Sequence, residues 1–390
     1  MSGQLPRLAI LPIFGAARPN IVYAQLFIDR SFSQAQSTSS MFVEIFADVG
    51  GIRWHSAFGL RQNCGDARGG KISSSDDANI KAALAALLDA TTISKVILPV
   101  KPAEVVGGLE TTLLHVRFKE DQVMVDQLVT HLWRQSVTYA LPKAKVRQYQ
   151  KRIKSDPTVA VEMVAAVKSA FMDFNKKYPH RADEVGEVLA YCICLEYLKA
   201  AQIAAKMALK TSSNMPVHGL DGIHAAFEDD AVTVYFLEAK LSKSEKLATK
   251  MYVDSVADFA TDKKQYLREY SIVSDLGNFD ALQGKQREIA LKYFDILGNP
   301  DMKLRERFVG VLCYSEKAVY ADSIPVSKGP VDKHEKHFAK KFLAKVPAMQ
   351  VAAAKALKAK GLDPAKSKLF FVAVPDADKL RELFHMEMAK

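Results

Sequence analysis

The sequence predicts an α/β fold in which helices alternate with strands that pair in parallel. In the last third of the chain, strand-like runs at 307–315 and 368–375 alternate with a helical region at about 331–360 and a closing helix at 376–390. Across the whole chain 49% of the residues are hydrophobic and 25% are charged, which is enough apolar material for a buried core.

The first 60 residues favour β-structure. Three segments rich in β-branched and aromatic residues, at 7–14, 20–30 and 40–50, are separated by turn-forming residues. A polar stretch at 63–78 ends in serine and aspartate residues, which can cap a helix at 78–90.

Further elements complete a predicted N-terminal α+β domain. Strands are expected at 95–100 and 111–119, and an amphipathic helix at 120–139. We therefore expect one domain over residues 1–139 and a second, α/β domain over residues 140–390.

The second domain is predicted to begin with helices. Residues 142–208 are mostly helical in pattern and are broken at Pro157 and near Pro179. Residues 185–195 are nearly all apolar, as in a helix that is buried on most sides. A more polar helix is expected at 244–262.

A β-hairpin is predicted between these helices. Asp229 and Asp230 supply the turn, and side chains alternate between the two faces of the strand that follows. Glu238 and Lys240 therefore point the same way, and Asp221 begins the preceding strand, so the hairpin can bring it beside Glu238.

This arrangement suits a metal site. Two carboxylates repel each other unless a cation lies between them, and Mg²⁺ or Mn²⁺ prefers such oxygen ligands. Asp221 and Glu238 are the predicted ligands, and Lys240 can hold an attacking water or offset phosphate charge. The alternative is an exposed hairpin end with a surface ion pair between Glu238 and Lys240.

Glu187 is the only charged residue between Val185 and Leu195, and a buried carboxylate needs a partner. It is either a further metal ligand, or it pairs with a lysine such as Lys206 or lies in water at the helix start. Glu184 is expected to be a solvated residue of the first helical turn.

Two side chains near the hairpin can contact substrate phosphate, Lys210 and His218. For Lys210 a packing or surface position is an equal alternative to a phosphate contact. The alternative for His218 is that it holds its own loop by a bond to the backbone.

Positive charge is concentrated in two stretches. The formal net charge is +10, of which residues 1–140 contribute +1, whereas residues 141–180 and residues 331–360 contribute +6 each. Each stretch is either a solvated helix face or part of a phosphate-contacting surface.

The four cysteines have no metal-binding C-x-x-C spacing, and no disulfide framework is indicated. The first residues lack a cleavage-site pattern, and no apolar run reaches the length of a membrane span. We therefore expect a cytoplasmic protein that does not enter a membrane.

The segment from about 186 to 245 resembles HamA, the family of nuclease subunits of the bacterial Hachiman anti-phage defence system. The resemblance rests on a Gly-Glu pair at 186–187, on Lys-Thr-Ser-x-Asn-Met-Pro-Val-His-Gly-x-Asp-Gly-x-His at 210–224, and on Glu-x-Lys at 238–240. It is looser over the rest of the chain from about residue 100, and residues 1–95 match nothing.

The resemblance implies a PD-(D/E)xK nuclease core, a mixed sheet flanked by helices, that cuts DNA and works with a helicase subunit. Asp221 takes the place of the motif aspartate, and Glu187 that of the helix glutamate. Leu220 replaces the proline of the motif name, a position that varies in this class. The alternatives are a non-catalytic nucleic-acid-binding or scaffold subunit, and a restriction or repair nuclease.

Overall fold

The computed structural model of the chain describes residues 12–13, 22–23, 40–49, 52–61, 74–177, 183–207, 219–296, 298, 304–321 and 332–390. The chain forms two compact units, Met1–Lys71 and Ile72–Lys390. The expected division between residues 139 and 140 falls inside the second unit, because strands from both sides of that point pair in one sheet.

The first unit contains four described strands. β1 (Pro12–Ile13) pairs with β2 (Val22–Tyr23), and β3 (Ser40–Val49) pairs with β4 (Ile52–Arg61), both in antiparallel fashion. The β-structure expected for the start of the chain is confirmed in these strands.

The second unit is built on one seven-stranded sheet in the order β5-β6-β13-β12-β11-β10-β9. The four inner strands from β6 to β11 are parallel, and the strands outside them pair in antiparallel fashion. The α/β prediction with a mixed sheet flanked by helices is confirmed. The strands are β5 (Ile97–Val106), β6 (Leu109–Val116), β9 (Ala201–Ala204), β10 (Gly222–Glu228), β11 (Ala231–Ser242), β12 (Arg305–Ser315) and β13 (Ser367–Val374).

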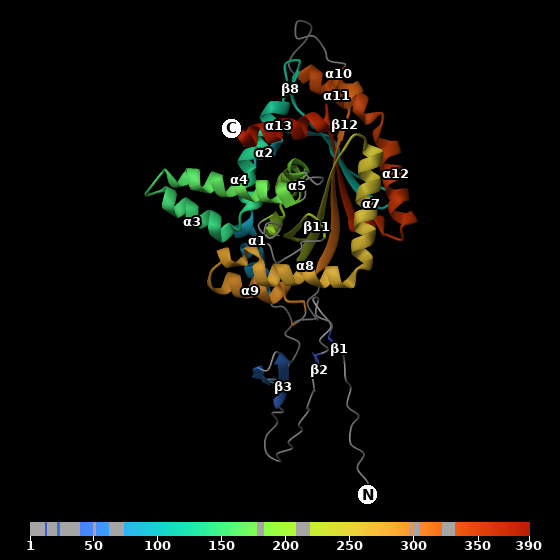
Figure 1. Cartoon of the computed structure of the whole chain (residues 1–390). Coiled ribbons are helices and arrows are strands. Elements are labelled where there is room, and N and C mark those ends of the chain that lie inside the picture. Colours follow the sequence, from blue (N-terminus) through green and yellow to red (C-terminus); the bar gives the residue numbers. More distant parts are fainter. Residues whose placement is uncertain are drawn as a thin grey trace. The chain divides into compact units, whose positions relative to one another are not determined.

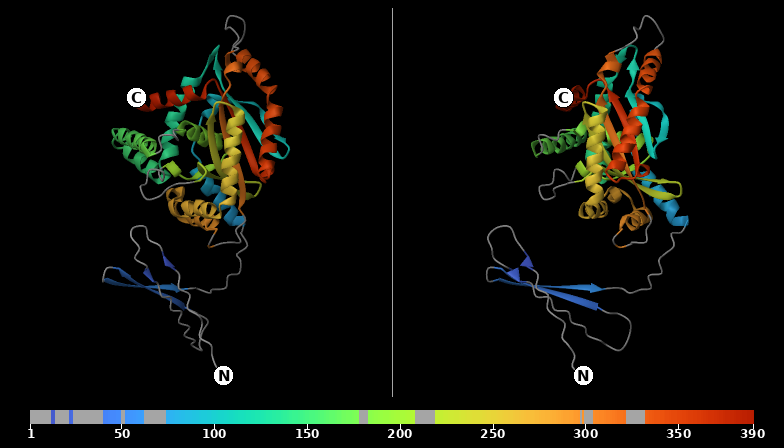
Figure 2. Two further views of the ribbon diagram at one scale, coloured as in Figure 1. Left: turned by 45° about the vertical axis from the view of Figure 1, so that its right-hand side comes forward. Right: turned by 90° about the vertical axis from the view of Figure 1, so that its right-hand side faces the viewer.

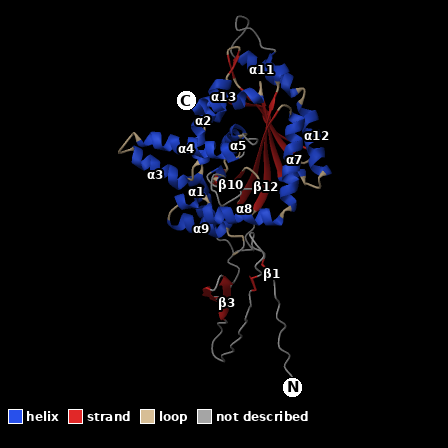
Figure 3. Cartoon of the chain, in the orientation of Figure 1, coloured by secondary structure: helices blue, strands red, loops and turns tan. Residues whose placement is uncertain are grey.

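Helices cover both faces of this sheet (Figures 1 and 3). Helices α2, α5 and α13 share one apolar core with the strands, and α7, α11 and α12 share another on the opposite face. Figure 2 shows α7 running alongside the sheet. The helices are α1 (Ser74–Leu87), α2 (Val125–Ala140), α3 (Lys143–Ile153), α4 (Val159–Lys177), α5 (Glu184–Tyr197), α7 (Glu245–Thr261), α8 (Lys263–Leu276), α9 (Gly284–Phe294), α10 (Lys317–Ala321), α11 (Asp332–Leu343), α12 (Val346–Ala359) and α13 (Ala377–Ala389).

Two predicted helices differ from the structure in extent. Helix α2 starts at Val125 rather than 120, because Glu120 adopts a positive φ of 58° in the turn between two short strands, β7 (Phe118–Lys119) and β8 (Gln122–Val123). The helical pattern predicted up to residue 208 ends at Tyr197, and β9 follows it as an edge strand beside β10.

The predicted hairpin is confirmed. Glu228 pairs with Ala231, so Asp229 and Asp230 form a two-residue turn, with φ values of 47° and 55°. Positive φ at both central residues is the backbone of a type I′ turn, which matches the twist of paired strands, and aspartate tolerates it better than most residues.

Within the residues that the structure describes, no helix combines the length and the apolar character needed to cross a bilayer.

Candidate functional site

The site lies where β11 extends beyond the start of β10. Gly222 pairs with Leu237 in antiparallel register, so one further step along both strands sets Asp221 opposite Glu238. The Oδ2 atom of Asp221 accepts a hydrogen bond of 2.9 Å from the backbone N–H of Ala239. That N–H belongs to the strand edge that β10 leaves uncovered, so the strand itself orients the aspartate.

Glu238 and Lys240 are paired with each other, but away from the surface. The Lys240 Nζ atom lies 2.5 Å from Oε1 of Glu238, and the two side chains are 18% and 6% exposed. The alternative of an exposed hairpin end with a surface ion pair is therefore wrong. A buried ion pair repays its desolvation only with good geometry and further hydrogen bonds, and Ser255 of α7 supplies one to Glu238.

Glu238 and Lys240 affect each other's pKa values, and the charge of Asp221 acts on both. Burial, and then the charge of Asp221, raise the pKa of Glu238 to about 7 although Lys240 opposes the shift. Burial works against the charged form of Lys240, but Glu238 and Asp221 outweigh it and raise the pKa of this lysine. Two carboxylates and one ammonium thus share a small volume of low polarity.

Close packing of α7 on the sheet brings Ser255 to Glu238. Gly310 on β12 pairs with Glu238, and a Cβ atom at Gly310 would lie 2.6 Å from Leu369 and 2.7 Å from Tyr252 of α7. A larger residue at 310 would push the helix and its serine away from the carboxylate.

Glu187 lies on α5, on the sheet face opposite to α7. It is 7% exposed and accepts a hydrogen bond from the hydroxyl of Tyr139, at the end of α2. Burial first, and then the charges of Glu187, Asp221 and Glu184, raise the pKa of Tyr139 far above its usual value. The charge of Asp221 thus reaches Tyr139, the residue whose hydroxyl bonds to Glu187.

Three expectations about neighbouring residues are wrong. Glu187 does not lie in water at the helix start, and Lys206 pairs with Glu269 rather than with Glu187. Glu184 is 1% exposed and not solvated, because α13 covers the first turn of α5 and places His385 3.9 Å from it. Lys210 and His218 lie outside the described residues.

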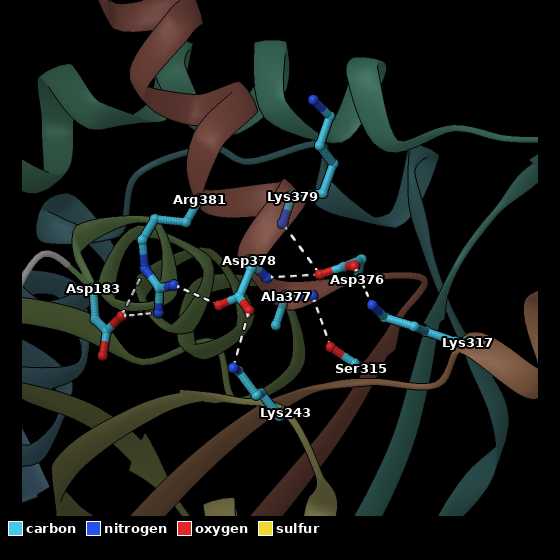
Figure 4. Close-up of polar contacts among 9 residues, drawn as sticks. All are labelled: Asp183, Lys243, Ser315, Lys317, Asp376, Ala377, Asp378, Lys379 and Arg381. Atoms are coloured by element: carbon cyan, nitrogen blue, oxygen red, sulfur yellow. Dashed lines mark hydrogen bonds and ion pairs between the residues drawn. The ribbon is translucent and has the colours of Figure 1, made fainter.

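Ion pairs fix the start of α5 to the start of α13 and to the end of β11 (Figure 4). Arg381 bonds to Asp183, the residue before α5, at 2.5 Å, and to Asp378 at 2.9 Å. Asp378 in turn lies 3.7 Å from Lys243, which follows β11 directly. The element that carries Glu187 is thus tied to the strand that carries Glu238.

The donor set fits a hard divalent cation. Asp221 and Glu238 offer carboxylate oxygens at opposite positions of the two strands. Burial first, and then the charge of Asp221, raise the pKa of Glu238, and a cation between the carboxylates would relieve their repulsion. In the described part of the chain, no group of three or more carboxylate, imidazole or thiol side chains is placed to hold a metal. The fit therefore rests on two carboxylates.

A basic helix begins close to this site. Helix α3 starts four residues after Tyr139, and its sequence KAKVRQYQKRI contains five basic residues and no acidic ones. Lys145 and Lys151 are exposed, as is Lys154 after the helix. The basic stretch predicted at 141–180 is thus an exposed helix surface in this part.

Sequence reasoning did not find Tyr139, Ser255 or Glu269 as members of this neighbourhood. Tyr139 lies far before the hairpin in sequence, whereas Ser255 and Glu269 lie on α7 and α8, the helices that follow it, and none of the three carries a local pattern that marks it. Lys206 did carry one, since it is a lone lysine in an apolar run.

A model of the HamA family matches residues 93–388 of the chain. The matched region contains all seven strands of the large sheet and every residue of the site described above. No curated protein matches the chain.

Proposed function

The chain belongs to the HamA family of the Hachiman anti-phage defence system, and from this premise we propose that it is a metal-dependent DNA nuclease. It hydrolyses phosphodiester bonds in the cytoplasm as the cleaving subunit of a complex with a helicase. The observation that supports this most is the grouping of Asp221, Glu238 and Lys240 at the open edge of β11.

Each residue has a distinct task in this proposal. Asp221 and Glu238 hold Mg²⁺ or Mn²⁺, which supplies Lewis acidity and lowers the pKa of a bound water. The N–H of Ala239 keeps Asp221 oriented. The Nζ atom of Lys240 lies 2.5 Å from Glu238. Beside the metal ligands, this ammonium group supplies a proton donor and a positive charge for the reacting phosphate.

Substrate binding is assigned to the basic surfaces. Phosphate contacts supply most of the sequence-independent affinity for DNA. Helix α3 starts four residues after Tyr139, whose hydroxyl bonds to Glu187, and the bound DNA backbone is placed along the exposed lysines of this helix.

In this proposal a helicase partner keeps the nuclease inactive until phage DNA is present. A free and constantly active DNA nuclease would damage its own host, so we propose that a helicase subunit covers the basic surface and releases it on phage-derived DNA. Such an interface would bury at least ~1,200 Å² in total.

The direct test is incubation of the purified protein with plasmid DNA and Mg²⁺, alone and together with the proposed helicase subunit. Cleavage by the wild type and none by Asp221→Ala is the expected result. If DNA is bound but never cut under any of these conditions, the chain is a non-catalytic DNA-binding or scaffold subunit.

The partnership is tested separately, by co-expression and size-exclusion chromatography. A stable complex is expected, together with slower cleavage when the helicase cannot hydrolyse nucleotide. Equal cleavage by the hydrolysis-dead complex on the same substrate would rule out gating by the helicase.

A further inference from the structure

A fully buried ion pair contacts the backbone of the residue directly before Asp221. Lys206, two residues after β9, and Glu269, on α8, are each 1% exposed, and their Nζ and Oε1 atoms are 2.6 Å apart. Buried ion pairs are weak contributors to stability, because desolvation offsets their attraction and apolar residues can often replace them. Fold stability alone therefore gives little reason for this pair.

The second partner of the lysine indicates another role. Besides Glu269, the Lys206 ammonium donates a hydrogen bond to the backbone carbonyl of Leu220. Leu220 immediately precedes Asp221, so this bond fixes the peptide from which the aspartate side chain extends.

Glu269 holds the same segment from a second side. Gly219 has a φ of +132°, and a Cβ atom there would collide with Oε1 of Glu269 and lie 2.7 Å from Nε2 of Gln265. The glutamate therefore fills the space that a side chain at 219 would take. The Lys206–Glu269 pair therefore contacts the backbone at both Gly219 and Leu220.

Asp221 is thus fixed at both ends. Lys206 and Glu269 hold its backbone, and the N–H of Ala239 holds its carboxylate. The charge of Asp221 also reaches the pair, since burial and then, in part, Asp221 act to raise the pKa of Glu269 against the opposing effect of Lys206. Small displacements of a ligand matter, because a metal site depends on groups that orient the ligating side chains.

We propose that Lys206 and Glu269 are positioning residues that set the Asp221 carboxylate at its distance from Glu238 for metal binding. The pair contacts neither substrate nor metal and acts through the Leu220 carbonyl. This inference rests on the proposed metal-dependent nuclease function.

The test compares Mn²⁺ affinity with thermal stability in the full chain. Lys206→Met/Glu269→Leu replaces the pair by apolar side chains of similar volume, which keeps the fold but removes the bond to Leu220. Titration calorimetry with Mn²⁺ should show binding at least ~10-fold weaker, the usual cost of losing a group that orients a ligand. Glu269→Gln keeps the acceptor oxygen and should stay near the wild-type affinity.

A stability control separates positioning from general weakening. Ile97→Ala removes a fully buried side chain on β5, the edge strand at the far end of the sheet from β9 and β10, and should lower the melting temperature without changing Mn²⁺ affinity. If the apolar pair does not fold, Lys206→Gln/Glu269→Gln replaces it. The glutamine side chain at 206 is shorter than lysine, so it cannot bond to residue 269 and to the Leu220 carbonyl at the same time. The same loss of Mn²⁺ affinity is expected.

The outcomes are distinguishable. If the wild type binds Mn²⁺ and cuts DNA, and a folded variant binds Mn²⁺ equally well, the positioning role is wrong and the nuclease function stands. Wild-type protein that binds no Mn²⁺ overturns both.

Discussion

The backbone N–H of Ala239 donates a hydrogen bond of 2.9 Å to the carboxylate of Asp221. The bond joins the residue between Glu238 and Lys240 to the aspartate on the neighbouring strand. It is possible because β10 begins at Gly222 and leaves this edge of β11 without a paired strand.

Loss of any of the three central side chains should abolish cleavage. Asp221→Asn, Glu238→Gln and Lys240→Met each remove a charge and largely keep the volume, and rates should fall by ~10²-fold or more. Lys250→Met, which removes an exposed charge on α7, is the control. Gel assays of plasmid cleavage on folded protein check this, and wild-type rates in all three variants would falsify the assignment.

Cleavage should depend on a hard divalent cation. Because the site offers carboxylate oxygens rather than thiolates, Mg²⁺ or Mn²⁺ should support activity and excess chelator should remove it. Calorimetric titration of the wild type and of Asp221→Asn with Mn²⁺ measures binding without turnover. Full activity in chelator contradicts the metal mechanism.

Glu187→Gln should weaken metal use more than folding. The change removes the charge but keeps an acceptor for the Tyr139 hydroxyl, so the concentration of Mg²⁺ for half-maximal cleavage should rise while the melting temperature changes little. Tyr139→Phe should have a smaller effect in the same direction. Tyr191→Phe is its matched control, since Tyr191 is equally buried but bonds to Asp89. A drop in stability with unchanged cleavage per folded molecule would assign Glu187 a structural role.

Charge reversal on α3 should weaken DNA binding in a salt-dependent way. Lys145→Glu/Lys151→Glu removes two exposed phosphate contacts, so the slope of log affinity against log salt should fall by about 2. Lys264→Glu/Lys285→Glu makes the same change in net charge on α8 and α9. Fluorescence anisotropy measures both variants. Equal losses of DNA affinity in the two variants would mean that binding depends only on the net charge of the protein.

Stability should fall in acid because of His224. Burial lowers the pKa of this histidine from 6.5 to about 4. Above pH 6.5 the histidine is neutral in both states, but between 6.5 and 4 the unfolded chain takes up a proton that the folded chain refuses. The free energy of unfolding should drop across this window by on the order of 3 kcal/mol. Thermal melts of wild type and His224→Leu test this, and parallel pH curves would contradict it.

Local sequence patterns were sufficient for the hairpin and its charged end. Side chains alternate between the two faces along residues 231–242, and a pair of aspartates supplies the turn, so the relation between Asp221 and Glu238 follows from short-range rules. Glu187 was indicated by its place as the only charge in an apolar helical run, and the resemblance to the HamA family gave it the place of the helix glutamate.

Long-range contacts could not be predicted in the same way. Lys206 and Glu269 are 63 residues apart, and no local pattern links a lysine after β9 to a glutamate on α8. The helical pattern of residues 142–208 hides the short strand β9, because Ala201–Ala204 has little strand propensity of its own. Its pairing with β10 decides its conformation, and that is a tertiary effect.

The position of β13 has a consequence for synthesis of the chain on the ribosome. This strand, residues 367–374, lies between β6 and β12, so the sheet remains in two separate pieces until those residues have emerged. Strand pairings of such wide sequence separation form late and slowly. The nascent chain therefore carries its hairpin long before the sheet is complete, so translation itself delays the appearance of the finished fold.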